Sequence, residues 1–286
     1  MKHAYLIIAH HEFEVLQKLL DVIDDERNDI YIHVDKKVKK LPVLNSEESS
    51  LTIIQNRVDV RWGHVSQIET EYVLFEAAYH SGNTYEYFHL ISGTHMPLKT
   101  QDYIHDVFGV LNGKEVLNYL YTDSYEAKFK INRFHFFLRN YKSSQPLIAR
   151  ASQLMWNVFM KIQKIFDIHH HKIDVSTKAN NWVSLTQSAV AYIISEKERV
   201  LKQFRYSFCG DEFFVPYLLE KANGRFAIHD ERRLLFNDFI GGTPRTITED
   251  DFDFLINSEY LFARKFSNSE VSVIDRVVHH INLSKS

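Results

Sequence analysis

Two adjacent carboxylates, Asp211 and Glu212, follow Gly210 in the segment FCGDEFFVPYLL. The glycine indicates a turn, and the apolar run after Glu212 predicts a helix that starts there. An acidic side chain at a helix N-terminus in apolar surroundings can stay ionised and fixed in position, which suits a general base. Taken alone, however, the pattern is more often that of an acidic helix cap.

Binding of a diphosphate by this chain would depend on cationic side chains. None of the nine glycines belongs to a GxGxxG or GxxxxGK loop. The Asp-x-Asp sequence at 251–253 follows Thr248 at a predicted helix start, where acidic residues interact favourably with the helix dipole. Arg264 and Lys265 lie between aromatic residues in LFARKF, and composition alone predicts exposed cations at a helix exit.

Histidines are numerous, with 16 in the chain, and two groups of them raise the question of a metal. His10 and His33 lie near predicted strand ends beside Asp35, as a metal-dependent phosphohydrolase would require. Adjacent strand residues face opposite sides, so His10 and His11 cannot both enter one site if the strand extends that far. The triplet 169–171 lacks a Glu at ligand spacing and lies in a predicted loop. No metal is predicted at either place.

Alternating strands and helices must position these residues. Short apolar runs predict buried strands, and apolar residues at helical spacing predict helices. The predicted strands are Tyr5–Ala9, Ile30–Val34, Ile53–Ile54, Tyr87–Ile91, Glu115–Tyr119, Trp182–Leu185 and one or two within 226–236. The predicted helices are Leu16–Ile23, Ser66–Tyr79, Gln101–Leu111, one that ends near Phe204, and Phe213–Lys221. Ser66 and Glu69 are predicted to form a capping box at the start of the second of these helices. This order predicts an open, mainly parallel α/β sheet flanked by helices. Ligands of such sheets bind beyond the carboxyl ends of the strands, where Asp35, Trp62 and the Ser92–Pro97 loop fall.

The segment 133–172 differs in composition from its surroundings. It holds seven Arg or Lys residues and one acidic residue, Asp167, with large apolar side chains among the cations. One interpretation is a helical insertion that packs on the core and has a solvated basic face. The other is an amphipathic element that contacts an anionic membrane or a lipid-linked substrate.

Composition excludes several classes of protein. The 286 residues are 45% hydrophobic and 25% charged, which excludes disorder, and 34 basic against 37 acidic residues give no reason to expect a nucleic-acid partner. The single cysteine, Cys209, allows no internal disulfide and indicates a reducing compartment. Without a signal peptide or an apolar run of ~20 residues, a cytoplasmic protein is expected. Without a linker or repeat, residues 1–286 are expected to form a single domain.

Several segments together resemble the Core-2/I-branching family of glycosyltransferases, the β-1,6-N-acetylglucosaminyltransferases and peptide O-xylosyltransferases. The matching segments are HAYLIIAHHEFEVLQKLLDVI, IYIHVDKK, Trp62-Gly63, YFHLISGTHMPLKT, WVSLTQSAVAYII, CGDEFFVPYLL and LFARKF. Their order and spacing cover most of the chain except about 125–175. The resemblance implies a GT-A-like fold with a nucleotide-binding half at 1–125, a helical basic insertion at about 126–175 and an acceptor or catalytic half at 176–286.

The resemblance also implies an inverting, metal-independent reaction without a cofactor, in which a UDP-sugar is the donor substrate. Glu212 would be the catalytic base that deprotonates the acceptor hydroxyl. Lys265 would bind the donor diphosphate, with Arg245 as its companion or Arg233 as the alternative. The other implied donor-binding residues are Ile8, His10, Asp35, Trp62, Ser92 and Gly93, and those on the acceptor or sugar side are His95, Trp182 and Asp211.

His95 departs from the family pattern, which usually has Asp at this position, so the donor sugar and the acceptor stay open. UDP-GlcNAc is the first expected donor, with UDP-xylose, UDP-galactose or UDP-glucuronate as alternatives. Because the cysteine-rich stem of the animal enzymes is missing, a bacterial-type enzyme of surface polysaccharide synthesis is favoured. Its acceptor would be a glycan or a lipid-linked glycan, with peripheral contact to the inner membrane face. The alternative outside enzymes is a membrane- or polysaccharide-binding protein that acts through 133–172.

Overall fold

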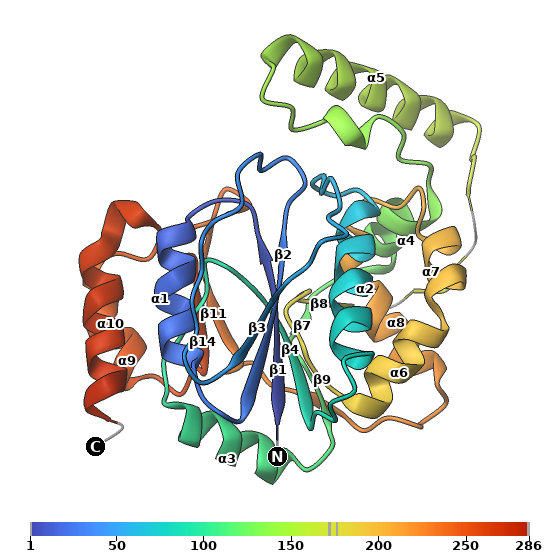
Figure 1. Cartoon of the computed structure of the whole chain (residues 1–286). Coiled ribbons are helices and arrows are strands. Elements are labelled where there is room, and N and C mark those ends of the chain that lie inside the picture. The colour runs from blue at the N-terminus through green and yellow to red at the C-terminus, as the bar shows by residue number, and fades with distance from the viewer. Residues whose placement is uncertain (1, 171–172, 176, 285–286) are drawn as a thin grey trace.

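A seven-stranded mixed sheet, in the order β10-β6-β9-β4-β1-β2-β3, forms the centre of the computed structural model, which describes residues 2–170, 173–175 and 177–284 (Figure 1). Its parallel part contains β1 (His3–Ala9), β2 (Asn28–Val34), β3 (Ser50–Ile53) and β4 (Tyr87–Ser92). Next to β4 lies the antiparallel β9 (Ser184–Thr186), followed by β6 (Glu115–Leu117) and β10 (Ile228–Asp230), which are parallel to each other. The predicted open, mainly parallel sheet is therefore confirmed.

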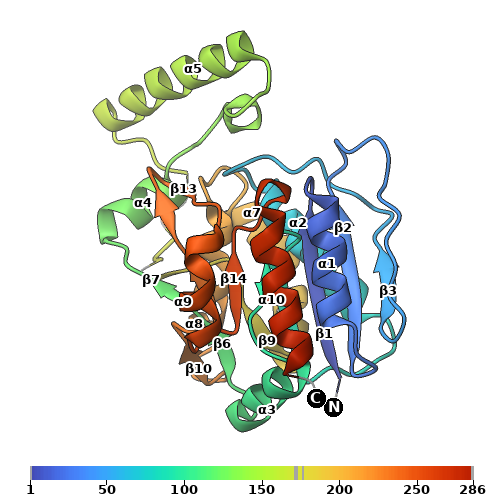
Figure 2. The same ribbon diagram turned by 90° about the vertical axis from the view of Figure 1, so that its left-hand side faces the viewer.

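Helices cover both faces of this sheet, as predicted. One layer consists of α1 (Phe13–Ile23), α9 (Phe252–Asn257) and α10 (Val271–Leu283), and the other contains α2 (Ser66–Tyr79), α6 (Gln187–Ser195), α7 (Lys197–Gln203) and α8 (Phe214–Lys221) (Figures 1 and 2). Across one end of the sheet lies α3 (Gln101–Leu111). Because both faces are covered, β2 and β4 are buried at every position, which explains why apolar residues make up most of both sequences.

Several predicted boundaries were wrong for local reasons. Ser66 does not cap α2, because Val65 is the N-cap residue and the Ser66 hydroxyl accepts a hydrogen bond from the backbone of Arg61 at 2.8 Å. The predicted strand 115–119 is divided into β6 and β7 (Tyr119–Leu120), and β7 pairs with β8 (Lys178–Ala179). The strand predicted at 182–185 begins two residues later, and the helix predicted to end near 204 consists of α6 and α7.

A second, three-stranded sheet joins distant parts of the chain. It contains β5 (Met96–Pro97), β11 (Leu235–Asn237) and β14 (Phe262–Arg264), in the order β11-β14-β5. Arg264 and Lys265 therefore lie at the end of a short strand, and the predicted helix exit is wrong. The predicted cap is confirmed: Thr248 and Asp251 form a capping box at η3 (Glu249–Asp251), and the Gly-Gly turn connects β12 (Phe239–Ile240) to β13 (Thr243–Pro244).

The basic insertion is helical, as predicted. It follows α4 (Ser124–Asn132) and contains η1 (Leu138–Asn140) and α5 (Pro146–Ile165). Both ribbon views show α5 standing away from the sheet, on the side where β1 and β2 end (Figures 1 and 2). Residues 171 and 172 of the predicted segment, and with them the third member of the histidine triplet, lie outside the described residues. Within the described ranges, no helix combines the length and apolar character that a membrane span requires.

Candidate active site

The carboxyl ends of β1, β2 and β4 bring several predicted donor-binding residues together. Ile8 of β1 pairs with Ser92 of β4, and Asp35 directly follows the last residue of β2. The backbone N–H of Asp35 donates to Ala9 at 2.9 Å, and that of Gly93 donates to Ile8 at 3.0 Å. These residues therefore lie along one edge of the sheet, where ligands of parallel α/β sheets bind.

Gly93 allows close packing at this edge. A Cβ atom on Gly93 would lie 3.2 Å from the Cβ of Ala9 and 3.5 Å from a methyl group of Leu16. The first distance is tighter than ordinary van der Waals contact, so a larger residue would push β1 and the backbone after β4 apart by a few tenths of an ångström. The glycine thus shapes the edge that was predicted to bind the donor.

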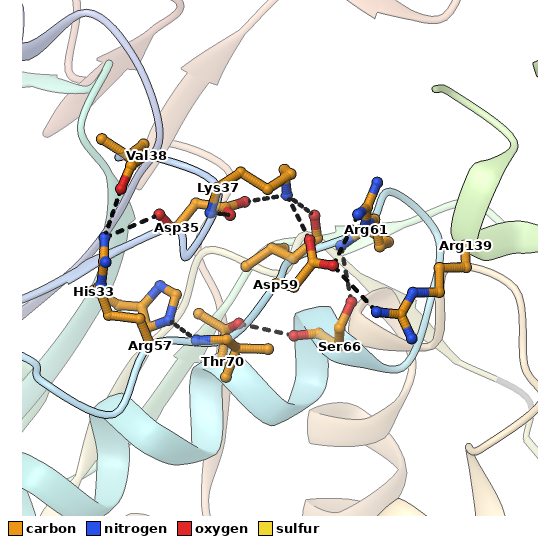
Figure 3. Close-up of polar contacts among 12 residues, drawn as sticks. His33, Asp35, Lys37, Val38, Arg57, Asp59, Arg61, Ser66, Thr70 and Arg139 are labelled. Carbon is orange, nitrogen blue, oxygen red and sulfur yellow. Dashed lines mark hydrogen bonds and ion pairs between the residues drawn. The ribbon is translucent and has the colours of Figure 1, made fainter. Parts of the chain in front are cut away.

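Asp35 lies in an ionic network that connects the end of β2 to the following loop (Figure 3). Its buried carboxylate accepts hydrogen bonds from the backbone N–H of Lys37 at 2.8 Å and from the Lys37 ammonium at 2.6 Å. Lys37 also pairs with Asp59 at 3.2 Å, and Asp59 pairs with Arg61 at 2.8 Å and Arg139 at 3.4 Å. Because Arg139 belongs to the insertion, the network also connects the insertion to this side of the sheet.

Contacts within the protein engage the histidines near Asp35. The Nε2 atom of His33 accepts a hydrogen bond from the backbone of Val58 at 2.8 Å, and burial lowers the pKa of His33 to about 4. The rings of His10 and His11 stack 4.0 Å apart, because β1 ends before them and the rule of opposite strand faces no longer applies. Across the residues that the structure describes, no three His, Cys, Asp or Glu side chains form a group able to hold a metal ion.

Lys265 is held at the same edge by the segment that follows β14. The backbone N–H of Phe266 donates to Thr94 at 3.0 Å, and the Ser267 hydroxyl donates to Glu12 at 2.7 Å. Lys265 thus lies between the loop after β4 and the residues after β1. Partial burial and the ring of His11 lower the pKa of His10, and the charges of Lys37 and Lys265 lower it further.

Arg264 is predicted from the sequence as an exposed cation, but in the structure it is partly buried. Burial lowers the pKa of its guanidinium to about 10, and the group lies 5.2 Å from the ring centroid of Trp182. Trp182 contacts His95 edge to face at 5.0 Å, and the Nδ1 atom of His95 accepts a hydrogen bond from the backbone of Ser92 at 3.0 Å. Neither Arg264 nor Lys265 forms an ion pair with any residue in the described part of the chain.

The two arginines predicted as companions of Lys265 already have carboxylate partners. Arg245 forms a bidentate pair with Asp251 at 2.8 and 2.7 Å and a third hydrogen bond with Asp238 at 2.8 Å. Arg233 pairs with two glutamates, at 3.0 and 2.9 Å. The roles of Arg245 and Arg233 stay predictions. A diphosphate would have to compete with these carboxylates for either arginine, whereas no carboxylate among the described residues pairs with Arg264.

Glu212 ends the short helix η2 (Gly210–Glu212) and carries a side chain flanked by two ammonium groups. The Nζ atoms of Lys130 and Lys178 each lie 3.3 Å from its carboxylate and 2.9 and 3.0 Å from that of Glu126. Burial alone would lower the pKa of Lys130, but Glu212 and Glu126 outweigh burial and raise it. Sequence analysis missed both lysines because α4 and β8 meet η2 only in the folded chain.

Asp211 connects Glu212 to the loop that carries Trp62. One Asp211 oxygen accepts a hydrogen bond from the Gln67 amide at 2.7 Å, and the Gln67 carbonyl oxygen accepts one from the backbone of Gly63. The carbonyl of Gly63 in turn accepts from Cys209 at 2.9 Å. Gly63 has a φ of +69°, and a Cβ atom there would lie 2.6 Å from the ring of Phe208, so no other residue fits without rearrangement.

Trp62 is half-exposed and contacts the insertion. The ammonium of Lys142 lies 3.6 Å from its ring centroid, and Tyr141 and Phe208 contact the ring at 5.9 and 5.2 Å. A cation at this distance over an indole face is attracted to it. The insertion therefore packs against a residue that was predicted to bind the donor.

Two buried carboxyl groups behind Glu212 make stability depend on pH. Glu71 of α2 is fully buried, and neither of its carboxyl oxygens has a hydrogen-bond partner among the described residues. Burial and then the charge of Asp211 raise the pKa of Glu71 well above its usual value, and burial and then Glu212 raise the pKa of Asp211 to about 7. The folded chain thus keeps protons that the unfolded chain loses above about pH 4, so stability falls as the pH rises from about 4 through about 7.

We expect Glu71→Gln to remove much of this loss, because an amide has no charge to bury. The difference in free energy of unfolding between variant and wild type should grow in favour of the variant between pH 4.5 and pH 8, because only the wild type has a carboxyl group whose pKa burial raises. Urea unfolding at the two pH values measures it, with Glu69→Gln on the same helix as the control. A difference that is equal at both pH values would show that Glu71 carries no such penalty.

The sequence model of the Core-2/I-Branching enzyme family matches residues 3–238, and the chain belongs to this family. A nucleotide-sugar donor and a glycan acceptor follow from this membership. The match ends before Arg245, Arg264 and Lys265, so the structure alone places these cations.

Solved structures with a similar fold share little sequence with this chain. Mouse xyloside xylosyltransferase 1 in its apo form has 8% identity and a TM-score of 0.39, with 92% of this chain and 96% of that chain covered. The 4-diphosphocytidyl-2C-methyl-D-erythritol synthase of Anaerococcus prevotii has 9% identity and a TM-score of 0.35, with 79% and 87% covered. No curated protein matches the sequence.

Proposed function

We propose that this glycosyltransferase is inverting and metal-independent and that it transfers a sugar, GlcNAc first, from a UDP-α-sugar to an acceptor hydroxyl. The observation that carries the proposal is the pair Arg264 and Lys265 at the carboxyl edge of the sheet. No carboxylate in the described ranges pairs with either cation, so both charges are available to a diphosphate. A metal would otherwise have to supply this charge, and no group of three ligating side chains occurs among the described residues.

The uridine and the diphosphate would bind on neighbouring parts of this edge. The base and ribose would contact the ends of β1 and β2, and the diphosphate would lie towards Lys265, with Arg264 or Arg245 as the second cation. The proposed donor-binding residues are Ile8, His10, Asp35, Trp62, Ser92, Gly93, Arg264 and Lys265. His95 and Trp182, two of the residues predicted on the acceptor or sugar side, adjoin Arg264 and are both buried.

The proposed reaction is a direct displacement. The Glu212 carboxylate takes the proton of the acceptor hydroxyl, and the hydroxyl oxygen forms a bond to the anomeric carbon as the bond from that carbon to UDP breaks. Lys265 and its companion cation stabilise the negative charge that develops on the leaving UDP. Because the acceptor attacks from the face opposite to UDP, an α-linked donor gives a β-glycoside.

The proposed acceptor is a glycan or lipid-linked glycan of surface polysaccharide synthesis, met at the cytoplasmic face of the membrane. Lys130 and Lys178 support an acceptor site beside Glu212, because both contact the same carboxylate oxygen, Oε2, and 29% of the side chain stays exposed. An acceptor hydroxyl can therefore approach the carboxylate without breaking either ion pair.

A panel of nucleotide sugars tests this proposal. Thermal-shift measurements with UDP-GlcNAc, UDP-xylose, UDP-galactose, UDP-glucuronate and UDP should show stabilisation that is the same with and without EDTA. The sugar that stabilises most at equal concentration identifies the donor, because the folding free energy that a bound ligand adds rises with the logarithm of its concentration divided by its dissociation constant. Stabilisation by a guanosine or adenosine diphosphate sugar alone would contradict the UDP specificity.

A further inference from the structure

Helix α5 exposes a continuous apolar stripe to solvent. Its 20 residues include Leu147, Leu154, Met155, Val158, Ile162 and Ile165, with exposed fractions of 80, 65, 49, 50, 40 and 75%. At 3.6 residues per turn these side chains fall within about a third of the helix circumference. Phe166 extends the stripe by one residue and is 72% exposed. A stripe of this length on one helix is far more than the scattered apolar residues of an ordinary surface.

The opposite face of α5 packs on the rest of the protein. The apolar stripe is therefore not the face through which α5 packs on the core. Ser152, Met160 and Gln163 are buried, and the Gln163 side chain exchanges hydrogen bonds with the backbone of Phe134 at 2.8 Å. The ring of Trp156 contacts Phe208 at 6.0 Å. This fixed orientation presents the apolar stripe outwards.

Unpaired cations border the stripe. Arg150, Lys161 and Lys164 lie along one of its edges at helical spacing, and none forms an ion pair within the described ranges. No Asp or Glu occurs from residue 133 to residue 166, and the next acidic residue, Asp167, pairs with Arg133 at 3.1 Å. An apolar face with cations at its border is complementary to a surface with apolar chains below and negative charges above.

From this juxtaposition we infer that α5 binds in the interface of an anionic phospholipid membrane, with the apolar stripe in the acyl region and the three cations at the phosphate groups. Helix α5 would then be the surface that makes the membrane contact of the proposed function, and the inference rests on that function. Two-fold pairing of α5 with a second copy is disfavoured, because it would bring six cations together without a carboxylate from either helix.

The insertion that contains α5 is attached to the candidate active site. Lys142 contacts Trp62, and Arg139 pairs with Asp59, so the segment that leads into α5 is fixed to the carboxyl edge of the sheet. Both ribbon views place α5 on the side of the molecule where β1 and β2 end (Figures 1 and 2). Membrane-bound α5 would thus hold the site near acceptors that are embedded in the same membrane.

Co-sedimentation with vesicles tests the inference. The wild-type chain should bind vesicles of phosphatidylcholine with 30 mol% phosphatidylglycerol at least tenfold more tightly than vesicles of phosphatidylcholine alone. Leu154→Ser with Ile165→Ser, and separately Arg150→Gln with Lys161→Gln and Lys164→Gln, should each weaken binding at least tenfold. Val43→Ser with Val110→Ser is the matched control, because these residues are 86 and 84% exposed outside α5, and it should bind as wild type does.

The inference is overturned if the wild type does not bind anionic vesicles, or if both α5 variants bind them as the wild type does. It is also overturned if light scattering shows a wild-type dimer that the serine substitutions dissociate and the wild type binds no vesicles. UDP thermal shifts and transfer to a soluble acceptor, measured on the same proteins, separate this inference from the proposed function. Loss of vesicle binding with normal transfer concerns α5 alone, whereas vesicle binding without any UDP binding would remove the proposed function and leave the membrane surface standing.

Discussion

Glu212→Gln is expected to lower the turnover number by ~10²-fold or more while UDP binds as it does to the wild type. The amide keeps the size of the side chain but cannot accept the proton of the acceptor hydroxyl. The proposed donor-binding residues are others, at the carboxyl edge of the sheet. Turnover measured by UDP release and UDP affinity measured by calorimetry give the two quantities separately.

Glu126 provides a matched control for this experiment. It shares both lysines with Glu212, at 2.9 and 3.0 Å, but lies on α4 outside the segment that resembles the family's catalytic motif. Glu126→Gln should therefore reduce turnover by less than ~10-fold, through the altered ion pairs alone. Equal losses in the two variants would assign the effect to the ionic cluster, and normal turnover of Glu212→Gln would remove Glu212 as the base.

Lys265→Ala is expected to weaken UDP binding by roughly 10- to 100-fold in excess EDTA. A hydrogen bond to a charged group contributes ~1.5–3 kcal/mol, and each 1.4 kcal/mol is a factor of ten in affinity. Arg264→Ala should have an effect of similar size, because no carboxylate in the described part of the chain balances this cation. Arg245→Ala should have a smaller effect, because Asp251 and Asp238 already engage its guanidinium.

Lys36→Ala is the control for these three variants, since Lys36 is an exposed cation near the same edge and its loss changes net charge equally. It should leave UDP affinity within about twofold, because an exposed charge without direct contact is screened by salt. The metal-free proposal fails if UDP binding requires manganese or magnesium and Lys265→Ala leaves it unchanged. If Arg245→Ala has the larger effect, Arg245 and not Arg264 is the companion of Lys265.

The main sheet could be predicted from the sequence because its strands are buried on both faces. Ile30 to Val34 and Tyr87 to Ile91 are apolar runs that no amphipathic helix would show, and both form strands. The two residues of β5, Met96–Pro97, are too few to show any period and form a strand only because β14 lies beside them. Ser66 is of a residue type that often caps helices. In the folded chain, however, the Ser66 hydroxyl accepts a hydrogen bond from the backbone N–H of Arg61 in the preceding loop.

Residues of the site could be predicted where a motif marks them and could not where only the folded chain brings them together. Glu212 and Lys265 lie in recognisable segments, and their roles stay predictions that the experiments above test. Lys178 is 34 residues from Glu212 and on a different element, so no local pattern indicates their ion pair. Composition predicts that Arg264 is an exposed cation, and its partial burial beside Trp182 is visible only in the folded chain.

The edge that is proposed to bind the donor uses residues from both ends of the chain, because the segment after β14 lies beside the residues after β1. The hydrogen bond between Ser267 and Glu12 spans 255 residues. At a translation rate of about 5–20 residues per second, a ribosome needs roughly 13–50 s to make the second partner after the first. During that time β1, β2 and β4 can pair, but the nascent chain has neither Arg264 nor Lys265 and cannot hold a diphosphate through them. Nucleotide binding can therefore stabilise this protein only after synthesis is nearly complete, and the early chain must stay soluble without it.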